Sequence, residues 1–125
     1  MSVISRIIGD TLSGKGGCTY SLSDGERIIF GSPFYALSLH KELEEIIPVE
    51  ELNETHIKMF IIKNSELLWQ PNVAIGTWVN EEQVYLDVTT LFSKHHTSLE
   101  QLRAMSTDQL AAWDMETNEV INLNQ

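Results

Sequence analysis

In two stretches of the sequence, apolar runs rich in β-branched and aromatic residues are separated by short polar segments, as is typical of β-hairpins. The segment 72–92, NVAIGTWVNEEQVYLDVTTLF, contains two runs rich in Val, Ile, Thr, Trp and Tyr, separated by the polar NEEQ. This arrangement predicts a β-hairpin. Further along, QLAAWDM (109–115) and EVINL (119–123) flank the turn-forming ETN, which predicts a second hairpin.

The first third of the chain also has strand-like composition. VISRII (3–8) is rich in β-branched residues and predicts a strand. CTYSLS (18–23) and ERIIF (26–30) flank Asp24-Gly25, a dipeptide typical of tight hairpin turns. FYALSL (34–39) follows the chain-breaking GSP and predicts one more strand.

Helical spacing occurs in the middle of the chain and again near residue 100. Residues 39–47 place their large apolar side chains on one helical face, with Pro48 as the end, but this segment stays open between helix and strand. Asn53 is a good N-cap for a helix over 54–64. Thr97 with Glu100 forms a capping-box pattern before a short helix.

Strands outnumber helices in this reading and do not alternate with them as βαβ units would. The pattern therefore predicts the α+β class: a mainly antiparallel sheet built from hairpins, with two or three short helices. A chain of 125 residues has room for a single compact domain, 1–125.

The charge balance changes the picture of the partners. Eighteen acidic residues face eight Lys and Arg, for a net charge of −10. Such a chain is a poor binder of nucleic acid or of an acidic membrane, whereas a basic protein surface would attract it. The candidate partner-binding residues are Glu42, Glu44, Glu45, Glu50, Glu51, Glu81 and Glu82. The alternative is that these glutamates only form a solvated face that keeps the protein soluble.

Candidate catalytic and metal-binding chemistry is sparse. Cys18 is the single cysteine, so neither an internal disulfide nor a cysteine-based zinc site is expected, and a reducing cytoplasm is the simplest location. The adjacent His95 and His96 diverge from one another, and no metal or other cofactor is expected. The apolar run in MSVISRIIGD is too short for a signal peptide.

The segment GDTLSGKG (9–16) nearly matches a phosphate-binding loop. Its last position is Gly16, where the loop needs a Ser or Thr hydroxyl for Mg²⁺, and it runs into a strand-like segment instead of a helix. Nucleotide hydrolysis is therefore not expected. A glycine-rich loop with one lysine could still hold an anion through its amides, which makes Lys15, Gly16 and Gly17 the ligand-binding candidates of an alternative hypothesis.

The second half resembles a group of small proteins carried by phages and other mobile elements. The shared pattern is a Trp-containing strand, then VYLDVS, a helix, a Gln and an AIWDL strand. Its counterparts here are Trp78, 84–88, Gln109 and 111–115, with Thr89 in place of Ser and Asp108 in place of Asn. GGCTYSLSDGE also looks like the glycine-led start of that group. The resemblance implies an accessory protein that acts inside a bacterial cell, and it carries over no activity or catalytic residues.

These observations lead to three hypotheses. The first is a non-enzymatic phage-type accessory protein that binds a host protein through an acidic surface, for example as a counter-defence inhibitor. The second is a protein that binds or sequesters a small molecule such as a nucleotide signal. The third is a small hydrolase using a carboxylate or Cys18. Hairpin edges such as 72–92 could also pair across a two-fold axis, which leaves a homo-oligomer open.

Overall fold

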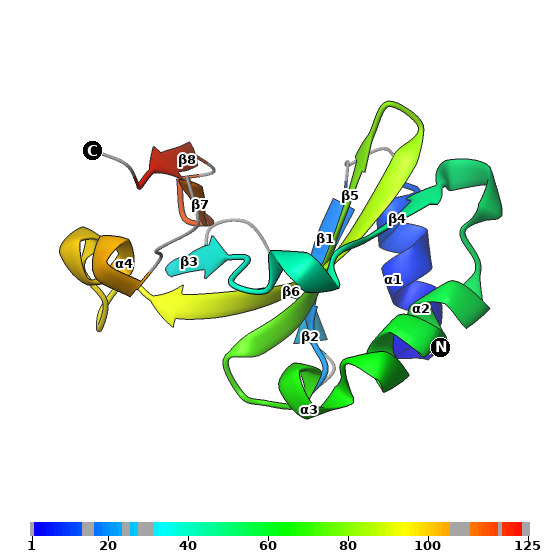
Figure 1. The fold of residues 1–125 in the computed structure, drawn as a ribbon, viewed down its shortest axis with the longest axis horizontal. Helices are drawn as coiled ribbons and strands as arrows, with labels where there is room; N and C mark the ends of the chain where they lie inside the picture. Colours follow the sequence, from blue (N-terminus) through cyan, green and yellow to red (C-terminus); the bar gives the residue numbers. More distant parts are fainter. Residues whose placement is uncertain are drawn as a thin grey trace.

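The computed structural model describes residues 2–13, 17–23, 26–27, 32–105, 111–117 and 119–123, and its strands form one antiparallel sheet flanked by helices (Figure 1). The α+β class predicted from the sequence is confirmed. In chain order the elements are α1 (Val3–Thr11), β1 (Gly17–Ser21), β2 (Glu26–Arg27), β3 (Phe34–Leu37), the 3₁₀ turn η1 (Lys41–Leu43), β4 (Glu45–Pro48), the 3₁₀ turn η2 (Val49–Glu51), α2 (Glu54–Lys63), α3 (Ser65–Leu68), β5 (Val73–Asn80), β6 (Gln83–Ser93), α4 (Leu99–Met105), β7 (Ala111–Asp114) and β8 (Glu119–Asn122).

The long strand β6 organises the sheet. The strand order is β2-β1-β5-β6-β3-β7-β8, and β4 also pairs with β6. One edge of β6 pairs with β5, while the other edge pairs first with β4, at residues 83–86, and then with β3, at residues 90–93. In Figure 1, β6 runs from the half of the molecule that contains α1 and α2 to the half that contains α4.

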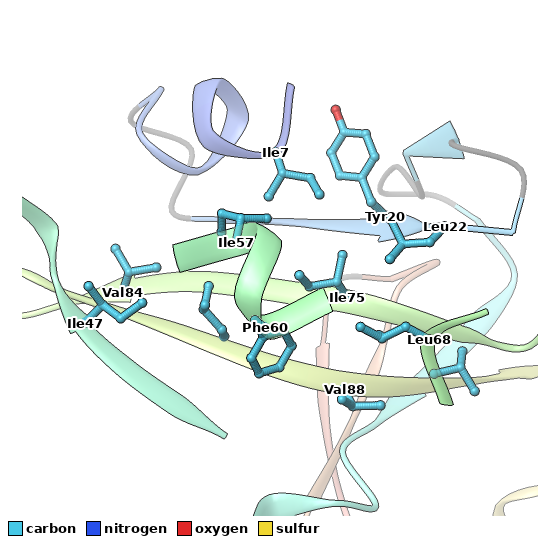
Figure 2. Close-up of a cluster of buried hydrophobic side chains, with 12 residues drawn as sticks. Ile7, Tyr20, Leu22, Ile47, Ile57, Phe60, Leu68, Ile75, Val84 and Val88 are labelled. Atoms are coloured by element: carbon cyan, nitrogen blue, oxygen red, sulfur yellow. The ribbon is translucent and has the colours of Figure 1, made fainter. Parts of the chain in front are cut away.

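Alternation along β6 divides the two faces of the sheet. Val84, Leu86 and Val88 are fully buried in a core beneath α1, α2 and α3, where Figure 2 shows Ile57 and Phe60 of α2 close to the strands. The residues between them, such as Tyr85 and Asp87, point to the opposite face because neighbouring side chains of a strand alternate. We call this second surface the open face.

Two smaller clusters complete the packing around the second half of β6. One joins Leu102 of α4 to Tyr35 and Leu37 of β3. The other lies on the open face and contains four buried residues, Ala36, Ala74, Leu91 and Met115. The strands of the C-terminal hairpin β7–β8 pair from Ala111 with Asn122 to Asp114 with Glu119. The hairpin contributes to both faces, because Ala112 belongs to the first cluster and the neighbouring Met115 to the second.

The predicted strand at 3–8 is wrong, because these residues belong to α1. Ser2 caps this helix with its hydroxyl, which accepts a hydrogen bond from the Ser5 amide at 3.2 Å. Ile7 is fully buried against β1, and Thr11, four residues later, is buried on the same face. The helical spacing of the apolar residues outweighs the β-branched composition, since packing of an amphipathic face overrides intrinsic propensity.

Most of the remaining predicted elements are confirmed. The hairpin at 72–92 is β5–β6, the C-terminal hairpin is β7–β8, and β1 pairs with β2 although the turn at 24–25 lies outside the described residues. Helix α2 begins after Asn53, whose side chain accepts a hydrogen bond from the His56 amide at 3.0 Å.

Two boundaries differ in detail from the sequence reading. The ambiguous segment 39–47 is not an α-helix. It forms the short 3₁₀ element η1 and then β4, where pairing with β6 satisfies the backbone of Ile46 and Ile47. The capping box of α4 is shifted by one residue. The Ser98 hydroxyl accepts from the Gln101 amide at 3.2 Å, and the Gln101 side chain accepts from the Ser98 amide at 2.9 Å.

Candidate functional site

The acidic residues predicted to bind a partner come together at one corner of the molecule. Pro48 pairs with Gln83, and the amide of Val49 donates a hydrogen bond of 2.9 Å to the carbonyl of Glu82. This contact joins η2 to the turn between β5 and β6. The turn follows η2 by about 30 residues in the sequence. Four exposed glutamates gather there, and we call them the acidic corner: Glu50, Glu51, Glu81 and Glu82. Within the described residues none of the four forms an ion pair.

The turn that carries two of these glutamates has an unusual backbone. Glu81 and Glu82 have φ angles of 51° and 66°. A two-residue hairpin with positive φ at both positions favours Asn and Gly, because left-handed backbone costs an L-residue about 1–2 kcal/mol. The sequence therefore keeps two carboxylates at a position where uncharged residues would be more stable.

The other three predicted glutamates are nearby but are arranged differently. The Oε1 atom of Glu42 lies 3.7 Å from Nδ1 of His40, and the Oε2 atom of Glu45 lies 3.7 Å from Nζ of Lys63. Glu44 lies at the boundary between η1 and β4, where its charge acts on Asp87 of β6. The predicted acidic surface is thus a corner of four glutamates, together with the exposed Glu42 in η1 and the less exposed Glu44 and Glu45 at the start of β4.

The candidate anion-binding loop falls largely outside the described residues, which exclude Lys15 and Gly16. Gly17 is described, and its φ is +151°. A Cβ at Gly17 would lie 2.0 Å from the carbonyl oxygen of Thr77, so close packing of β1 on β5 already requires glycine here. The binding hypothesis for this loop stays a prediction.

Cys18 lies in a small polar cluster between α1 and the sheet. Its sulfur is 3.3 Å from the hydroxyl of Thr77 and 3.5 Å from that of Thr11, and the two hydroxyls are 2.6 Å apart. The Thr11 hydroxyl also donates to the carbonyl of Ile7 at 2.6 Å. These contacts tie α1 to β1 and β5, which gives the cysteine a structural role.

A pocket on the open face was missed in the sequence reading. It has a volume of about 280 Å³, and its lining combines aliphatic, aromatic and polar side chains from β3, β6, β7 and β8. We call it the Asp87 pocket, and its lining residues are Ala36, Leu37, Ser38, Asp87, Thr89, Ala112, Trp113 and Val120.

Asp87 gives this pocket its chemistry. The Thr89 hydroxyl donates a hydrogen bond of 2.5 Å to its Oδ1 atom. Burial raises the pKa of Asp87 from the ordinary 3.8 to about 6; the bond from Thr89 opposes this shift, and the negative charge of Glu44 adds to it. The hydroxyl of Ser38 is buried and has no hydrogen-bond partner within the described residues. The pocket thus combines a carboxyl group that ionises close to neutral pH with an unused hydroxyl.

Gly76 makes room for this arrangement from the neighbouring strand. It pairs with Asp87 across β5 and β6. A Cβ at this position would lie 2.7 Å from the Asp87 carboxylate and 2.7 Å from the Thr89 hydroxyl. Glycine therefore allows both side chains to lie over the strand.

An aromatic pair lies between the Asp87 pocket and the acidic corner. Trp78 and Tyr85 are cross-strand partners whose rings stack with centroids 4.0 Å apart. Ile46 pairs with Tyr85 from β4, so it lies on the same face, and it is 50% exposed. The open face therefore presents apolar surface beside its carboxylates.

Asp114, at the end of β7, has a structural role. Its Oδ1 accepts hydrogen bonds from the amides of Glu116 and Thr117, at 3.0 and 3.3 Å, and Lys94 contacts its Oδ2 at 2.8 Å. Burial alone would raise the pKa of Asp114. The hydrogen bonds from Lys94 and from the two backbone amides outweigh burial and hold this pKa below its usual value. Asp87 differs from Asp114 because it lies within β6 and caps no turn.

The histidines and the helices add no further site within the part of the chain that the structure describes. No three His, Cys, Asp or Glu side chains there come together as metal ligands, and no helix there is long and apolar enough to cross a membrane. His95 and His96 are exposed in the turn after β6.

The sequence did contain a signal for the Asp87 pocket. In VYLDVT the valines and the leucine alternate with Tyr85, Asp87 and Thr89. Period-two alternation therefore places an acid and a hydroxyl on one face of a strand, two residues apart. No family model, curated protein or solved structure matches this chain, so the resemblance to phage-carried proteins stays a prediction.

Proposed function

We propose that the protein is a non-enzymatic binding protein whose acidic corner docks on a basic surface of a host protein. The observation that carries this proposal is the contact between η2 and the β5–β6 turn, which collects four exposed glutamates with no ion pair among the described residues. Their charges add to a net charge of −10, which speeds encounters with a basic partner and disfavours nucleic acid.

The backbone of the turn supports the same function. Strained backbone persists where the surrounding structure or a function maintains it. Here the strained residues are Glu81 and Glu82, at the tip of a hairpin. A turn that served stability alone would carry Asn-Gly.

The cellular setting completes the proposal. The resemblance to phage-carried proteins supports an accessory protein in the cytoplasm of a bacterial host. An acidic surface fits the basic, nucleic-acid-binding face of a host enzyme, and covering that face would inhibit a defence reaction.

The test replaces the two turn residues by the pair that the turn prefers, Glu81→Asn with Glu82→Gly. Affinity capture from a bacterial lysate, with quantitative mass spectrometry, compares the tagged wild type with this variant. Exposed ion pairs contribute roughly 0.2–1 kcal/mol each, so the loss of two should weaken partner binding about two- to thirtyfold. The variant should also be more stable than the wild type, so reduced binding would not reflect unfolding.

A matched control removes the same charge elsewhere. Glu66→Gln on α3 with Glu100→Gln on α4 also changes the net charge from −10 to −8, and both residues are exposed. Figure 1 shows α3 and α4 away from the tip of the β5–β6 hairpin. We expect the control to retain the partner that the turn variant loses. If the wild type retains no host protein, or if both variants lose it equally, the acidic corner is not the binding surface.

A further inference from the structure

The Asp87 pocket has an excess of hydrogen-bond acceptors over donors. The Oδ1 atom of Asp87 already receives the Thr89 hydroxyl, and the second carboxylate oxygen has no donor among the described residues. The buried Ser38 hydroxyl is also unpaired there, and it can accept a hydrogen bond. Buried polar atoms are normally paired, so an incoming group with several N–H donors would satisfy both sites.

The charge of the pocket selects a cation. Asp87 and the neighbouring Glu44 are both acidic, and the described residues that line the cavity include no basic side chain. A phosphate or carboxylate ligand would be repelled, which excludes a nucleotide signal at this position. A cation that pairs with Asp87 also offsets the cost of ionising a partly buried carboxyl group.

The walls and the size fit an amino-acid side chain. Trp113 offers an indole ring, while Ala36 and Val120 offer aliphatic surface for a hydrocarbon stem. Val120 is 76% exposed, so the mouth of the pocket is apolar and accessible. The volume of about 280 Å³ is just below the roughly 300–1,000 Å³ of pockets for drug-sized ligands.

We infer that the Asp87 pocket is the receptor for one arginine side chain of a basic protein partner. Arginine is favoured over lysine because its planar guanidinium group can stack on an indole, presents five donors, and is less strongly hydrated than an ammonium group. This inference rests on the proposed function, and it adds a specific contact on the open face to the charge attraction of the acidic corner.

The experiment is an NMR titration of the ¹⁵N-labelled protein with acetyl-Gly-Arg-Gly-amide. The indole N–H of Trp113 and the amides of Asp87 and Thr89 should shift progressively as the peptide is added. The same peptide with citrulline, a neutral isostere of arginine, should leave these signals in place. Asp87→Asn should weaken binding at least about tenfold, because it removes a charge-assisted contact.

A second variant keeps the test independent of Asp87. Val120→Lys changes an exposed residue, so folding is preserved, and it places a competing cation at the mouth of the pocket. We expect this variant to lose the shift of Trp113. If the Trp113 signal does not move up to the solubility limit of the arginine peptide, or moves equally with citrulline, the inference is overturned.

A parallel titration with deca-arginine separates this inference from the proposed function. The amides of Val49 and Glu82 report on the acidic corner, and Trp113 reports on the pocket. Shifts at the corner without shifts at Trp113 would overturn the arginine pocket and leave the proposed function standing. If neither the acidic-corner amides nor Trp113 shifts, both the arginine pocket and the proposed function are overturned.

Discussion

The substitution Asp87→Asn tests whether the ionised Asp87 carboxylate on the open face lowers the stability of the folded protein. An aspartate with an ordinary pKa ionises at the same pH in the folded and the unfolded chain. Asp87 does not, because burial raises its pKa from 3.8 to about 6. Between these values the folded protein holds a proton that the unfolded chain has already released, so stability falls as the pH rises from about 4 to about 6.

The size of this effect follows from the shift. Two pKa units correspond to about 3 kcal/mol, since each unit represents about 1.4 kcal/mol. Asparagine is never charged, and its side-chain oxygen can still accept the hydrogen bond from Thr89. We therefore expect the variant to match the wild type near pH 4 and to be more stable by about 3 kcal/mol above pH 7.

The measurement is urea unfolding of both proteins across pH 4 to 8, followed by tryptophan fluorescence. At each pH, the free energy of unfolding of the wild type is subtracted from that of the variant. This subtraction cancels the contributions of groups that titrate equally in both proteins. A difference that does not vary with pH, or a variant that is less stable than the wild type at pH 7.5, would contradict the raised pKa of Asp87. A substitution that stabilises the protein and also weakens arginine binding would identify Asp87 as a functional residue.

Two further predictions concern the same pocket. Gly76→Ala should destabilise the protein by about 1–2 kcal/mol in urea unfolding and shift the Trp113 indole signal, because its Cβ displaces Asp87 and Thr89. The control Gly9→Ala lies in α1 with nothing within 4 Å of its Cβ, and it should instead stabilise by about 0.5–1 kcal/mol; equal effects would contradict the crowding at Gly76. In a carboxyl ¹³C titration, Thr89→Val should raise the pKa of Asp87 and Glu44→Gln should lower it, and a shift in the opposite direction in either variant would show that the cause is misassigned.

The sequence predicted the elements whose signals are local. Asn53 is the N-cap of the predicted helix, as expected. The two β-branched and aromatic runs around NEEQ in 72–92 indicated β5–β6 because both strands are neighbours in the chain. The failure at 3–8 has a physical cause. Val and Ile favour strands by composition, yet the burial of Ile7 and Thr11 on one helical face decides the structure, and that burial depends on β1 and β5.

The candidate site was less predictable because it depends on pairing between distant segments. The glutamates were recognisable by type, but nothing local to Glu50 or Glu82 specifies that β4 pairs with the first part of β6. Asp87 was recognisable as an acid in an alternating strand. Its pocket also needs β3 and the β7–β8 hairpin, which reach the open face only through the second half of β6.

The geometry of β6 sets how one partner could use both parts of the surface. Glu82 immediately precedes this strand and Asp87 is five residues further along, which corresponds to about 17 Å at roughly 3.3 Å per residue. An extended basic segment of about the same length would place one arginine in the Asp87 pocket while further basic residues reach the acidic corner. The aromatic pair Trp78 and Tyr85 lies between the two, where it can contact the aliphatic stems of the intervening side chains. A rigid strand that carries both contacts fixes their spacing, so the surface can discriminate between basic partners by the spacing of their charges as well as by their total charge.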